Sequence, residues 1–365
     1  VRNLGLLESA RCLASYITSR IRPRPHEEDF ESYIINRFGK RLYHTFFKTY
    51  TEKVWGLPCT EIRAAWAAQR IRGLSFWSAI RAAVFGNGRS GIKSLIEEFY
   101  YPKYGPGMLW ERVGALIEAG GGEIQRNTEA VAIEDGGPYR ISVRTVEGGI
   151  EADTVITTAA LRDLIRMLPD VPAEVQAAAN GLRYRDFLTV GLIVNAEELW
   201  PDTWIYVHDD SVMVGRIQNF KNWSPTMVPD PTTTSLGLEY FVSEGDRLWR
   251  MADADLIALG TREIEALKLL PEGAHVTDGF VIRVPKTYPI YDDGYETRVA
   301  TIRGFLETRH PRIITVGRNG MHRYNNQDHS MLTAMLAVEN LLDGARNDLW
   351  SINTDRVYHE EKRKE

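Results

Sequence analysis

Cysteine is scarce in this sequence. Cys12 and Cys59 are the only two cysteines among 365 residues, and they form neither a C-x-x-C pair nor a regularly spaced framework. This excludes a small secreted domain held together by disulfides, and it indicates the cytoplasm as the compartment. Two chemically inert thiols, buried or on the surface, are favoured over one reactive thiol.

Long apolar runs and an excess of positive charge are missing as well. No stretch reaches about 18 apolar residues, so no membrane span is predicted. The net charge of −5 provides no excess of positive charge for binding nucleic acid. The eight histidines are scattered, and no carboxylate–histidine spacing of a known metal site surrounds the pair His322 and His329. We therefore expect neither a nucleic-acid partner nor a bound metal.

A dinucleotide-binding fingerprint in its usual setting is the third absence. The single G-x-G-x-x-G, Gly86–Gly91, follows Trp77–Phe85, which is predicted to be helical. The fingerprint needs a strand before it and a helix after it within one β-α-β unit. We interpret Gly86–Gly91 as a surface loop, with nucleotide binding as the alternative.

The composition that remains is that of a globular protein, with 44% hydrophobic and 25% charged residues. The length is sufficient for two interleaved domains with a sizeable core. Helices dominate residues 1 to 100, including one capped by Asp29 that ends at Phe38 and one from Lys40 to Tyr50. A strand is predicted over Glu123–Ile133, after a helix over Leu109–Ala119.

Alternating patterns dominate the middle of the chain. Strands are predicted over Leu188–Asn195, Trp204–His208, Met213–Asn219, Ser235–Val242 and Val276–Val284. One helix, Asp253–Leu269, interrupts them, so this region is predicted to be an antiparallel sheet with a helix across one face.

The segment Ile313–Leu342 carries the strongest candidate site. The β-branched run Ile313–Val316 predicts a buried parallel strand that ends at Gly317-Arg318. A polar loop follows, and then an apolar helix with Asn326 or Asp328 as its N-cap. A strand end beside a helix N-terminus suits a phosphate or an electron-rich ring, because free amides and the helix dipole point at it. An ordinary strand–helix crossover is the alternative.

An aromatic segment, Phe46–Pro58, is the other distinctive stretch: FFKTYTEKVWGLP. Most of its aromatic side chains are expected in a helical core. Tyr50 and Lys53 are the functional candidates, because a charge among aromatic rings is costly to bury without a partner.

These two segments resemble the FAD-dependent superfamily that contains amine oxidases, protoporphyrinogen oxidase and UDP-galactopyranose mutase. Phe46–Gly56 is similar to the FFxxYTxKxWG signature of the mutase branch, and the Gly317-Arg318 turn is similar to that branch's flavin-binding segment. The resemblance implies an α/β fold: a glutathione-reductase-like FAD-binding sheet domain, an antiparallel substrate domain with a helix, and a helical subdomain.

The resemblance also implies site residues. It assigns the following cofactor contacts: Val131, Gly317, Arg318, Tyr324, Asn326 and Asp328. It leaves the catalytic residues open among the following: Tyr50, Lys53, Tyr288 and Tyr291. If FAD is bound, we expect Tyr50, Lys53, Tyr288 and Arg318 to converge near its ring.

The domain boundaries that follow are discontinuous. They are a helical cap over 1–100, FAD-binding portions over 101–170 and 296–345, a substrate domain over 171–295 and a flexible tail over 346–365. In the superfamily the G-x-G-x-x-G lies at the extreme N-terminus, and its absence there predicts that the first β-α-β unit is missing. We therefore expect weak or no FAD in this chain alone, and either self-association or capture of an N-terminal fragment in trans.

Three functions are compatible with these patterns. The first is an FAD-dependent oxidoreductase that takes a hydride from an unidentified small organic substrate. The second is a mutase-like flavin isomerase, which Glu52 disfavours because an acid there would repel a nucleotide-sugar diphosphate. The third is a non-catalytic fragment or subunit that lacks FAD.

Overall fold

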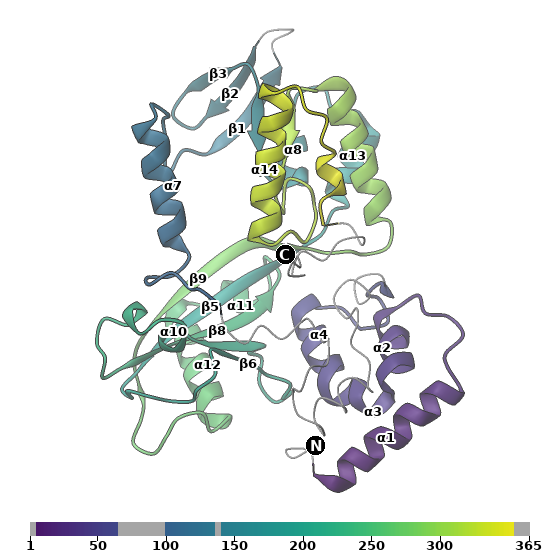
Figure 1. Ribbon diagram of the computed structural model, residues 1–365, viewed down its shortest axis with the longest axis vertical. Helices are drawn as coiled ribbons and strands as arrows, with labels where there is room; N and C mark the ends of the chain where they lie inside the picture. Colours follow the sequence, from purple (N-terminus) through teal and green to yellow (C-terminus); the bar gives the residue numbers. More distant parts are fainter. Residues whose placement is uncertain (1–4, 65–98, 136–139, 354–365) are drawn as a thin grey trace, which may run out of the picture. The chain divides into compact units, whose positions relative to one another are not determined.

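The computed structural model describes residues 5–64, 99–135 and 140–353 (Figure 1). The chain divides into two compact units. The first unit comprises Val1–Val113, Asp186–Pro285 and Glu360–Glu365, and the second comprises Gly114–Arg185 and Lys286–His359. Each unit is described by itself. The predicted Gly86–Gly91 loop and the helix over Trp77–Phe85 lie outside the described residues.

The first unit begins with helices. α1 covers Leu6–Ile21 and α2 covers Phe30–Phe38. Asp29 caps α2 as predicted, because its carboxylate accepts a hydrogen bond from the Ser32 amide at 2.7 Å. Gly39 ends α2 at φ 87°, where an added Cβ would lie 2.7 Å from the Tyr16 backbone nitrogen. Glycine is therefore required where α2 turns past α1.

The third helix is longer than predicted and changes its winding. α3 (Lys40–Leu42) continues as the π-helix η1 (Tyr43–Lys48) and then as α4 (Thr49–Trp55). Gly56 ends it in the left-handed conformation, at φ 62°. The predicted end at Tyr50 was therefore five residues early, because apolar periodicity does not show where a wider helical turn shifts the register.

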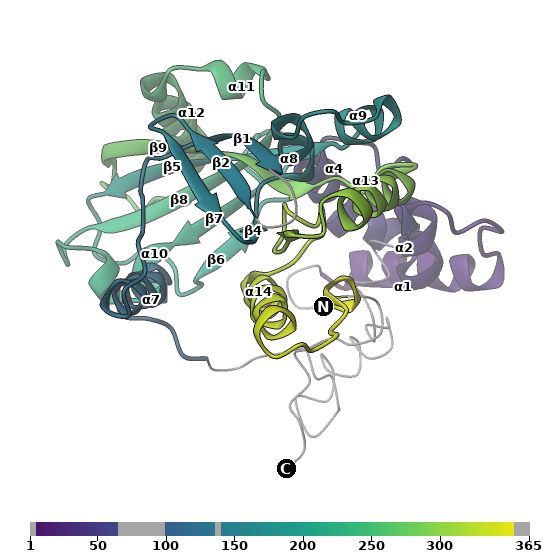
Figure 2. The same ribbon diagram turned by 90° about the horizontal axis from the view of Figure 1, so that it is seen from above.

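A five-stranded sheet forms the rest of the first unit's core. Its spatial order is β6-β7-β8-β5-β9. The strands are β5 (Tyr184–Val194), β6 (Trp204–Tyr206), β7 (Arg216–Asn219), β8 (Thr234–Val242) and β9 (Val276–Pro289). The β5–β8, β6–β7 and β7–β8 pairs are antiparallel. All five predicted strands are confirmed, as is the helix, α12 (Asp253–Ala266), which lies along one face (Figure 2).

The two faces of this sheet differ in chemistry. Leu188, Val190 and Leu192 point to the side covered by α12, where Leu256 and Ile264 complete a buried core. Their neighbours along the strands point the other way. On that other face glycines make room for rings: a Cβ on Gly237 would lie 2.7 Å from the Phe220 ring.

Short helices and stacked rings flank the sheet. They are α10 (Phe220–Trp223), η2 (Pro225–Met227) and α11 (Arg247–Arg250). Trp204 stacks on Trp223 with ring centroids 5.0 Å apart, whereas Trp200 and Trp249 pack against the core. These four tryptophans therefore divide between the two faces of the sheet. α7 (Gly107–Ala119) spans the boundary between the units.

Two small sheets belong to the second unit. β1 (Ala130–Asp135), β2 (Ile141–Thr145) and β3 (Gly149–Ala152) form an antiparallel meander. β4 (Val155–Thr157) pairs in parallel with β10 (Ile313–Thr315). The parallel strand predicted at Ile313 is thus confirmed. The strand predicted over Glu123–Ile133 is confirmed only in part, because it starts at Ala130 and ends at Asp135, and it pairs antiparallel with β2.

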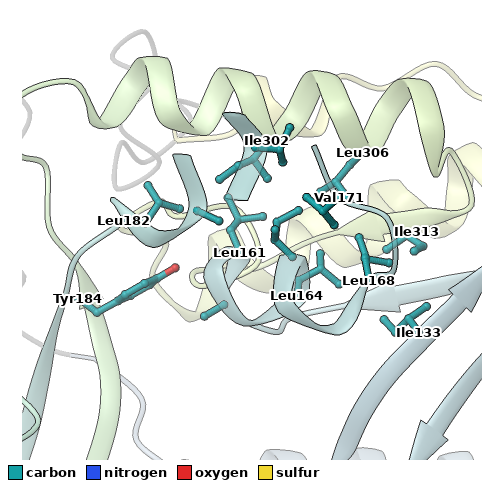
Figure 3. Close-up of a cluster of buried hydrophobic side chains, with 14 of the residues drawn as sticks. Ile133, Leu161, Leu164, Leu168, Val171, Leu182, Tyr184, Ile302, Leu306 and Ile313 are labelled. Atoms are coloured by element: carbon teal, nitrogen blue, oxygen red, sulfur yellow. The ribbon is translucent and has the colours of Figure 1, made fainter. Parts of the chain in front are cut away.

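Four helices accompany these strands in the described part of the second unit, and the first three contribute to its buried core. They are α8 (Leu161–Met167), α9 (Ala173–Asn180), α13 (Tyr295–Arg309) and α14 (Gln327–Leu342). Figure 3 shows side chains of α8, α13 and β10 interlocking, with Leu161, Leu164 and Ile302 fully buried. A short 3₁₀ turn, η3 (Leu349–Ser351), follows. Arg323 donates hydrogen bonds to the carbonyls of Trp350 and Ile352, which holds this part of the predicted tail in place.

Candidate functional site

A sharp turn follows strand β10 in the second unit. Val316 donates to the Thr157 carbonyl at 3.0 Å, and Gly317 then turns the chain at φ 78°. The Gly317 amide donates to the Thr333 hydroxyl on α14 at 3.0 Å. The buried Asn325 amide donates to the Gly317 carbonyl at 3.1 Å. Glycine satisfies the positive φ, and the two hydrogen bonds tie strand end, loop and helix together.

Arg318 is held beside a pair of stacked aromatic rings. Its guanidinium carbon lies 5.3 Å from the Tyr288 ring centre and 4.8 Å from the Tyr324 ring centre. The two rings stack on each other at 5.3 Å. Arg318 also donates to the carbonyls of Asn325 and Thr287, at 2.8 and 3.0 Å. The predicted residues Arg318, Tyr288 and Tyr324 therefore form one cluster with a fixed positive charge.

The helix start after this loop has the predicted cap. Asn326 is the N-cap of α14, and its own backbone amide lies 3.3 Å from His329 Nδ1. Asp328 is largely exposed in the first turn, with a carboxylate oxygen 3.2 Å from the same nitrogen. A carboxylate in the first turn interacts favourably with the positive end of the helix dipole, so Asp328 has a structural role as well as the implied cofactor role.

Tyr291 and Val131 are two further predicted residues of the second unit. The Tyr291 hydroxyl accepts a hydrogen bond from the Tyr324 amide at 2.6 Å, and its ring stacks on Tyr295 at 4.5 Å. Tyr291 therefore shapes the loop that carries Tyr324. Val131 lies on β1 at a register irregularity and is 44% exposed, so its side chain is accessible to a ligand.

His322 is a residue of this loop that the sequence considered only as a metal ligand. Its side chain is 2% exposed, and its backbone has φ 44°, which is uncommon for a non-glycine residue. Its Nε2 lies 3.3 Å from the Ile290 carbonyl, and its ring packs edge-on against Tyr184. Burial lowers the pKa of His322 to about 4, so the imidazole is neutral near pH 7.

In the first unit, Lys53 binds backbone carbonyls. Its ammonium donates to Asp209 at 2.6 Å, to Val214 at 3.1 Å and to Val207 at 3.5 Å. All three carbonyls belong to the segment that joins β6 to β7. Burial lowers the pKa of Lys53, an effect that the carboxylate of Glu263 opposes. Sequence analysis predicted that a charge at this position needs a partner, and the structure supplies three backbone carbonyls.

Glu263 completes the arrangement from α12. Its carboxylate is 6% exposed and accepts hydrogen bonds from the amides of Met213 and Val214, at 2.5 and 3.0 Å. The Tyr240 hydroxyl donates to it at 2.9 Å. Sequence analysis missed Glu263, because a glutamate inside a charged helix has no pattern that marks it as buried.

Tyr50 packs against the sheet face opposite α12. Its ring centre lies 5.0 Å from Tyr206, 5.7 Å from His208 and 6.4 Å from Phe241. Arg216 stands opposite both Tyr206 and Glu239 in the strand register, so the three share this face.

We call this surface the polar–aromatic face. It consists of Tyr50, Tyr206, His208, Arg216, Glu239 and Phe241.

The charges on this face cancel. Glu239 is 2% exposed and accepts hydrogen bonds from Arg216 and Gln218. The ion pair leaves no net charge among these three side chains. Arg216 and Glu239 were not predicted as site residues, because they come from two strands and meet only in the sheet.

Glu52 binds a backbone amide, and the two cysteines are buried. Glu52 Oε1 accepts a hydrogen bond from the Cys59 amide at 3.2 Å. Burial raises the pKa of Cys59 to about 12, and burial also raises the pKa of Cys12. Both thiols are free and buried, which agrees with the prediction of inert cysteines.

The structure thus groups the predicted residues into two sets. Tyr288, Arg318 and Tyr324 meet in the second unit, and Tyr50 and Lys53 lie on helix α4 of the first unit. Their convergence around one ligand stays a prediction.

Within the described ranges, no three His, Cys, Asp or Glu side chains are grouped closely enough to hold a metal ion. Across those same ranges, no helix combines the length and the apolar character that crossing a bilayer requires.

Comparison with known proteins identifies the family. The family described as flavin containing amine oxidoreductase matches residues 20–297, about three quarters of the sequence. This chain therefore belongs to the flavin-containing amine oxidoreductase family. Membership implies a flavin cofactor, and the mixed α/β architecture with antiparallel sheets is that of FAD-dependent oxidoreductases.

Solved structures share this fold. The crystal structure of reduced UDP-galactopyranose mutase is 22% identical, with a TM-score of 0.79 over 93% of this chain and 72% of that one. A provisionally assigned protoporphyrinogen oxidase from Exiguobacterium sp. 255-15 is 18% identical, with a TM-score of 0.65 over 92% and 72%. A CLA-producing fatty acid isomerase from P. acnes is 13% identical, with a TM-score of 0.59 over 94% and 77%. At these identities the likeness concerns the fold alone.

Proposed function

We propose that this chain is an FAD-dependent oxidoreductase of the amine oxidase and protoporphyrinogen oxidase type, acting on a small organic molecule. The observation that carries the proposal is the Gly317-Arg318 turn, set between a parallel strand and the N-terminus of α14 in a member of a flavin family. The catalytic candidates remain Tyr50, Lys53, Tyr288 and Tyr291. A cytoplasmic location is part of the same proposal.

The residues of the turn fit the ring end of a flavin. Arg318 supplies a fixed positive charge, Tyr288 and Tyr324 supply flat apolar surfaces, and α14 directs its positive end at the loop. The remaining cofactor residues of the proposal are Gly317, Asn326, Asp328 and Val131. The phosphate end has no glycine fingerprint among the described residues, since Gly86–Gly91 lies outside them.

The chemistry follows from these contacts. A bound flavin supplies hydride acceptance. Two carbonyls hold Arg318, so its guanidinium is already oriented. Its positive charge therefore stabilises an electron-rich ring placed over it, and the side chain does not have to move. The buried and neutral His322 keeps the loop's interior free of a competing charge near pH 7.

A mutase-like flavin isomerase is the second candidate, favoured by the FFxxYTxKxWG match at Phe46–Gly56. The polar–aromatic face disfavours it. Arg216 is neutralised by Glu239, so the cation that a sugar-nucleotide diphosphate needs is already paired. A non-catalytic subunit without FAD is the third candidate.

Flavin binding and reduction test the proposal. We expect the protein, produced at the full length that its gene encodes, to bind FAD and to be bleached by at least one amine or other reduced organic substrate under anaerobic conditions. Arg318→Ala should weaken FAD binding at least tenfold, with a smaller effect on stability, and exposed Arg309→Ala is the matched control. Absence of FAD binding would support the non-catalytic alternative. Turnover of a sugar nucleotide by the reduced protein without net oxidation would support the mutase.

A further inference from the structure

A cavity of about 470 Å³ lies along β10 in the second unit. Its walls come from β10, the second half of α13, the end of α14 and the segment 346–350. The described residues that line it do not include any member of the Arg318 cluster. Its volume is in the range of small-molecule sites in proteins. We propose that this cavity is a binding site for an adenine nucleoside monophosphate, separate from the flavin and independent of the proposed oxidation.

The edge of β10 that faces away from β4 carries backbone groups for a ligand. The Val155 amide of β4 donates to the Arg312 carbonyl at 2.9 Å, and the Val316 amide donates back to β4 at 3.0 Å. Backbone groups alternate sides along a strand, so the even-numbered residues here face β4. The Ile313 carbonyl and both the amide and the carbonyl of Thr315 therefore point away from β4, and these two residues line the cavity. In the described part of the chain, β4 is the only strand paired with β10.

Along this edge the three groups are an acceptor, a donor and a second acceptor. Adenine carries the complementary order on one side of its ring: the exocyclic amine donates, the neighbouring ring nitrogen accepts, and the next C–H is a weak donor. The amine thus matches the Ile313 carbonyl, and the ring nitrogen and C–H match the amide and carbonyl of Thr315. A hypoxanthine ring has an acceptor beside a donor, so it satisfies only two of the three groups. The edge therefore favours adenine.

An extended peptide is the other ligand that a strand edge can bind. β10 comprises only Ile313–Thr315, Pro311 lies before it, and the chain turns at Gly317 after it. The segment 346–350 forms a further wall, and α14 holds that segment through two hydrogen bonds to Asn347. The edge is therefore long enough for a ring but too short for a second strand to pair along it.

Apolar side chains supply the surface against which a base can stack. Leu349 and Trp350 come from η3, and Leu306 comes from α13. The Arg303 guanidinium carbon lies 5.1 Å from the Trp350 ring centre, which helps to hold the indole in place. Stacking on an aromatic side chain stabilises any bound base, because every base has a π-face. The backbone edge then provides the selectivity.

The charges around the cavity favour a single phosphate. The Arg303 guanidinium is paired with the Glu307 carboxylate at 2.6 Å and lies 3.9 Å from that of Asp348. Arg346 is exposed and pairs with no side chain in the described part of the chain. One unpaired guanidinium matches one phosphate, whereas a di- or triphosphate brings more negative charge toward two carboxylates. The mononucleotide is therefore the ligand that fits.

Calorimetric titration of the full-length protein, with and without added FAD, tests the ligand class. We expect AMP to bind under both conditions, and adenosine to bind about tenfold more weakly because it lacks the phosphate. ATP should bind more weakly than AMP, because its extra charges approach Glu307 and Asp348. The 6-dimethylamino analogue of AMP keeps the ring and the phosphate but has no donor for the Ile313 carbonyl, so it should bind roughly 100-fold more weakly or worse.

Three results would overturn the proposal. The first is absence of AMP binding, or equal affinity for AMP and its 6-dimethylamino analogue, since the edge would then not recognise the base. The second is displacement of AMP by FAD, which would place AMP in the cofactor's own site. The third is binding of acetyl-tetraalanine amide in place of AMP, which would assign the edge to an extended peptide. These titrations do not measure flavin reduction, so this site and the proposed function can fail independently.

Substitutions in the cavity wall test the location. Arg346→Gln should weaken AMP binding about tenfold and leave adenosine binding unchanged. Arg309→Gln, at an exposed arginine of α13 outside the cavity, should bind AMP as the wild type does. Trp350→Leu keeps an apolar side chain but removes the ring, so AMP and adenosine should both bind about tenfold more weakly or worse. Unchanged AMP affinity in both Arg346→Gln and Trp350→Leu would place AMP elsewhere and overturn the assignment.

Discussion

Lys53 and Glu263 bind the two polar groups of the same residue. Lys53 Nζ lies 3.1 Å from the Val214 carbonyl oxygen, and Glu263 Oε2 lies 3.0 Å from the Val214 nitrogen. A half-buried lysine and a buried glutamate thus interact through the backbone of one residue rather than by direct contact. Each charge meets the dipole that it favours, which offsets part of the cost of burying it.

Removal of this lysine should destabilise the first unit. Lys53→Met keeps the aliphatic stem but leaves three carbonyls without their donor, and we expect a loss of about 2 to 4 kcal/mol in the free energy of unfolding. Urea denaturation at pH 7 measures it. Lys40→Met, at an exposed lysine earlier in the same helix, should change stability by less than about 0.5 kcal/mol. Equal effects of the two substitutions would show that the carbonyl contacts contribute nothing.

The pKa of His322 makes stability depend on pH. Its folded pKa of about 4 lies below the ordinary 6.5, so the unfolded chain takes up the proton first as pH falls. The contribution is complete above pH 6.5 and is lost between 6.5 and 4, by roughly 3 kcal/mol. His322→Asn, which tolerates the positive φ, should lose less stability over that window. Parallel stability curves for the two proteins would contradict this.

Substitution by alanine should change the stability of the protein in opposite directions at two glycines. A Cβ on Gly320 would lie 2.5 Å from the Val316 oxygen and 2.8 Å from the Thr157 oxygen, both backbone atoms. Gly320→Ala should therefore destabilise the protein by about 2 kcal/mol or more. Gly304, exposed within α13, has no atom near that position, so Gly304→Ala should stabilise by about 0.5 to 1 kcal/mol. Thermal unfolding of both variants decides it, and a mild Gly320→Ala would mean that the turn can widen.

An apolar face on α14 should promote association. Met335 is 58% exposed and Leu342 78%, and Val338 and Leu341 extend the same exposed surface. β4 ends its two-stranded sheet nearby in the same unit, with Ile156 exposed at that edge. Light scattering after size exclusion should show concentration-dependent mass that Val338→Glu reduces. The control is Ala300→Glu on the exposed side of α13, and equal mass for all three proteins at every concentration would contradict the prediction.

Local signals predicted much of the fold. Asp29 before an apolar run located the start of α2, and period-two alternation located every strand of the five-stranded sheet. These signals are reliable because capping and alternation involve residues close in sequence. The strand predicted from Glu123 starts only at Ala130, because apolar periodicity does not show where pairing with a neighbouring strand begins.

Important features of the first unit's candidate site could not be predicted from such local signals. Lys53 was identified from its aromatic surroundings, but its carbonyl partners lie more than 150 positions away. His208 has no motif around it, and it gains its setting only when β6 meets helix α4. The Arg318 cluster was partly predictable, because Gly317, Arg318 and Tyr324 lie in one loop, whereas Tyr288 comes from β9.

The π-helix Tyr43–Lys48 has a consequence for how the chain can vary in length. A π turn holds one residue more than an α turn, so it absorbs an insertion without displacing the helix on either side. Relatives with one residue fewer between Tyr43 and Tyr50 should therefore form a continuous α-helix and still direct Tyr50 and Lys53 at the same strands. Motif searches that forbid a gap ahead of Tyr50 will pass over such relatives, and alignments of this family should allow one there.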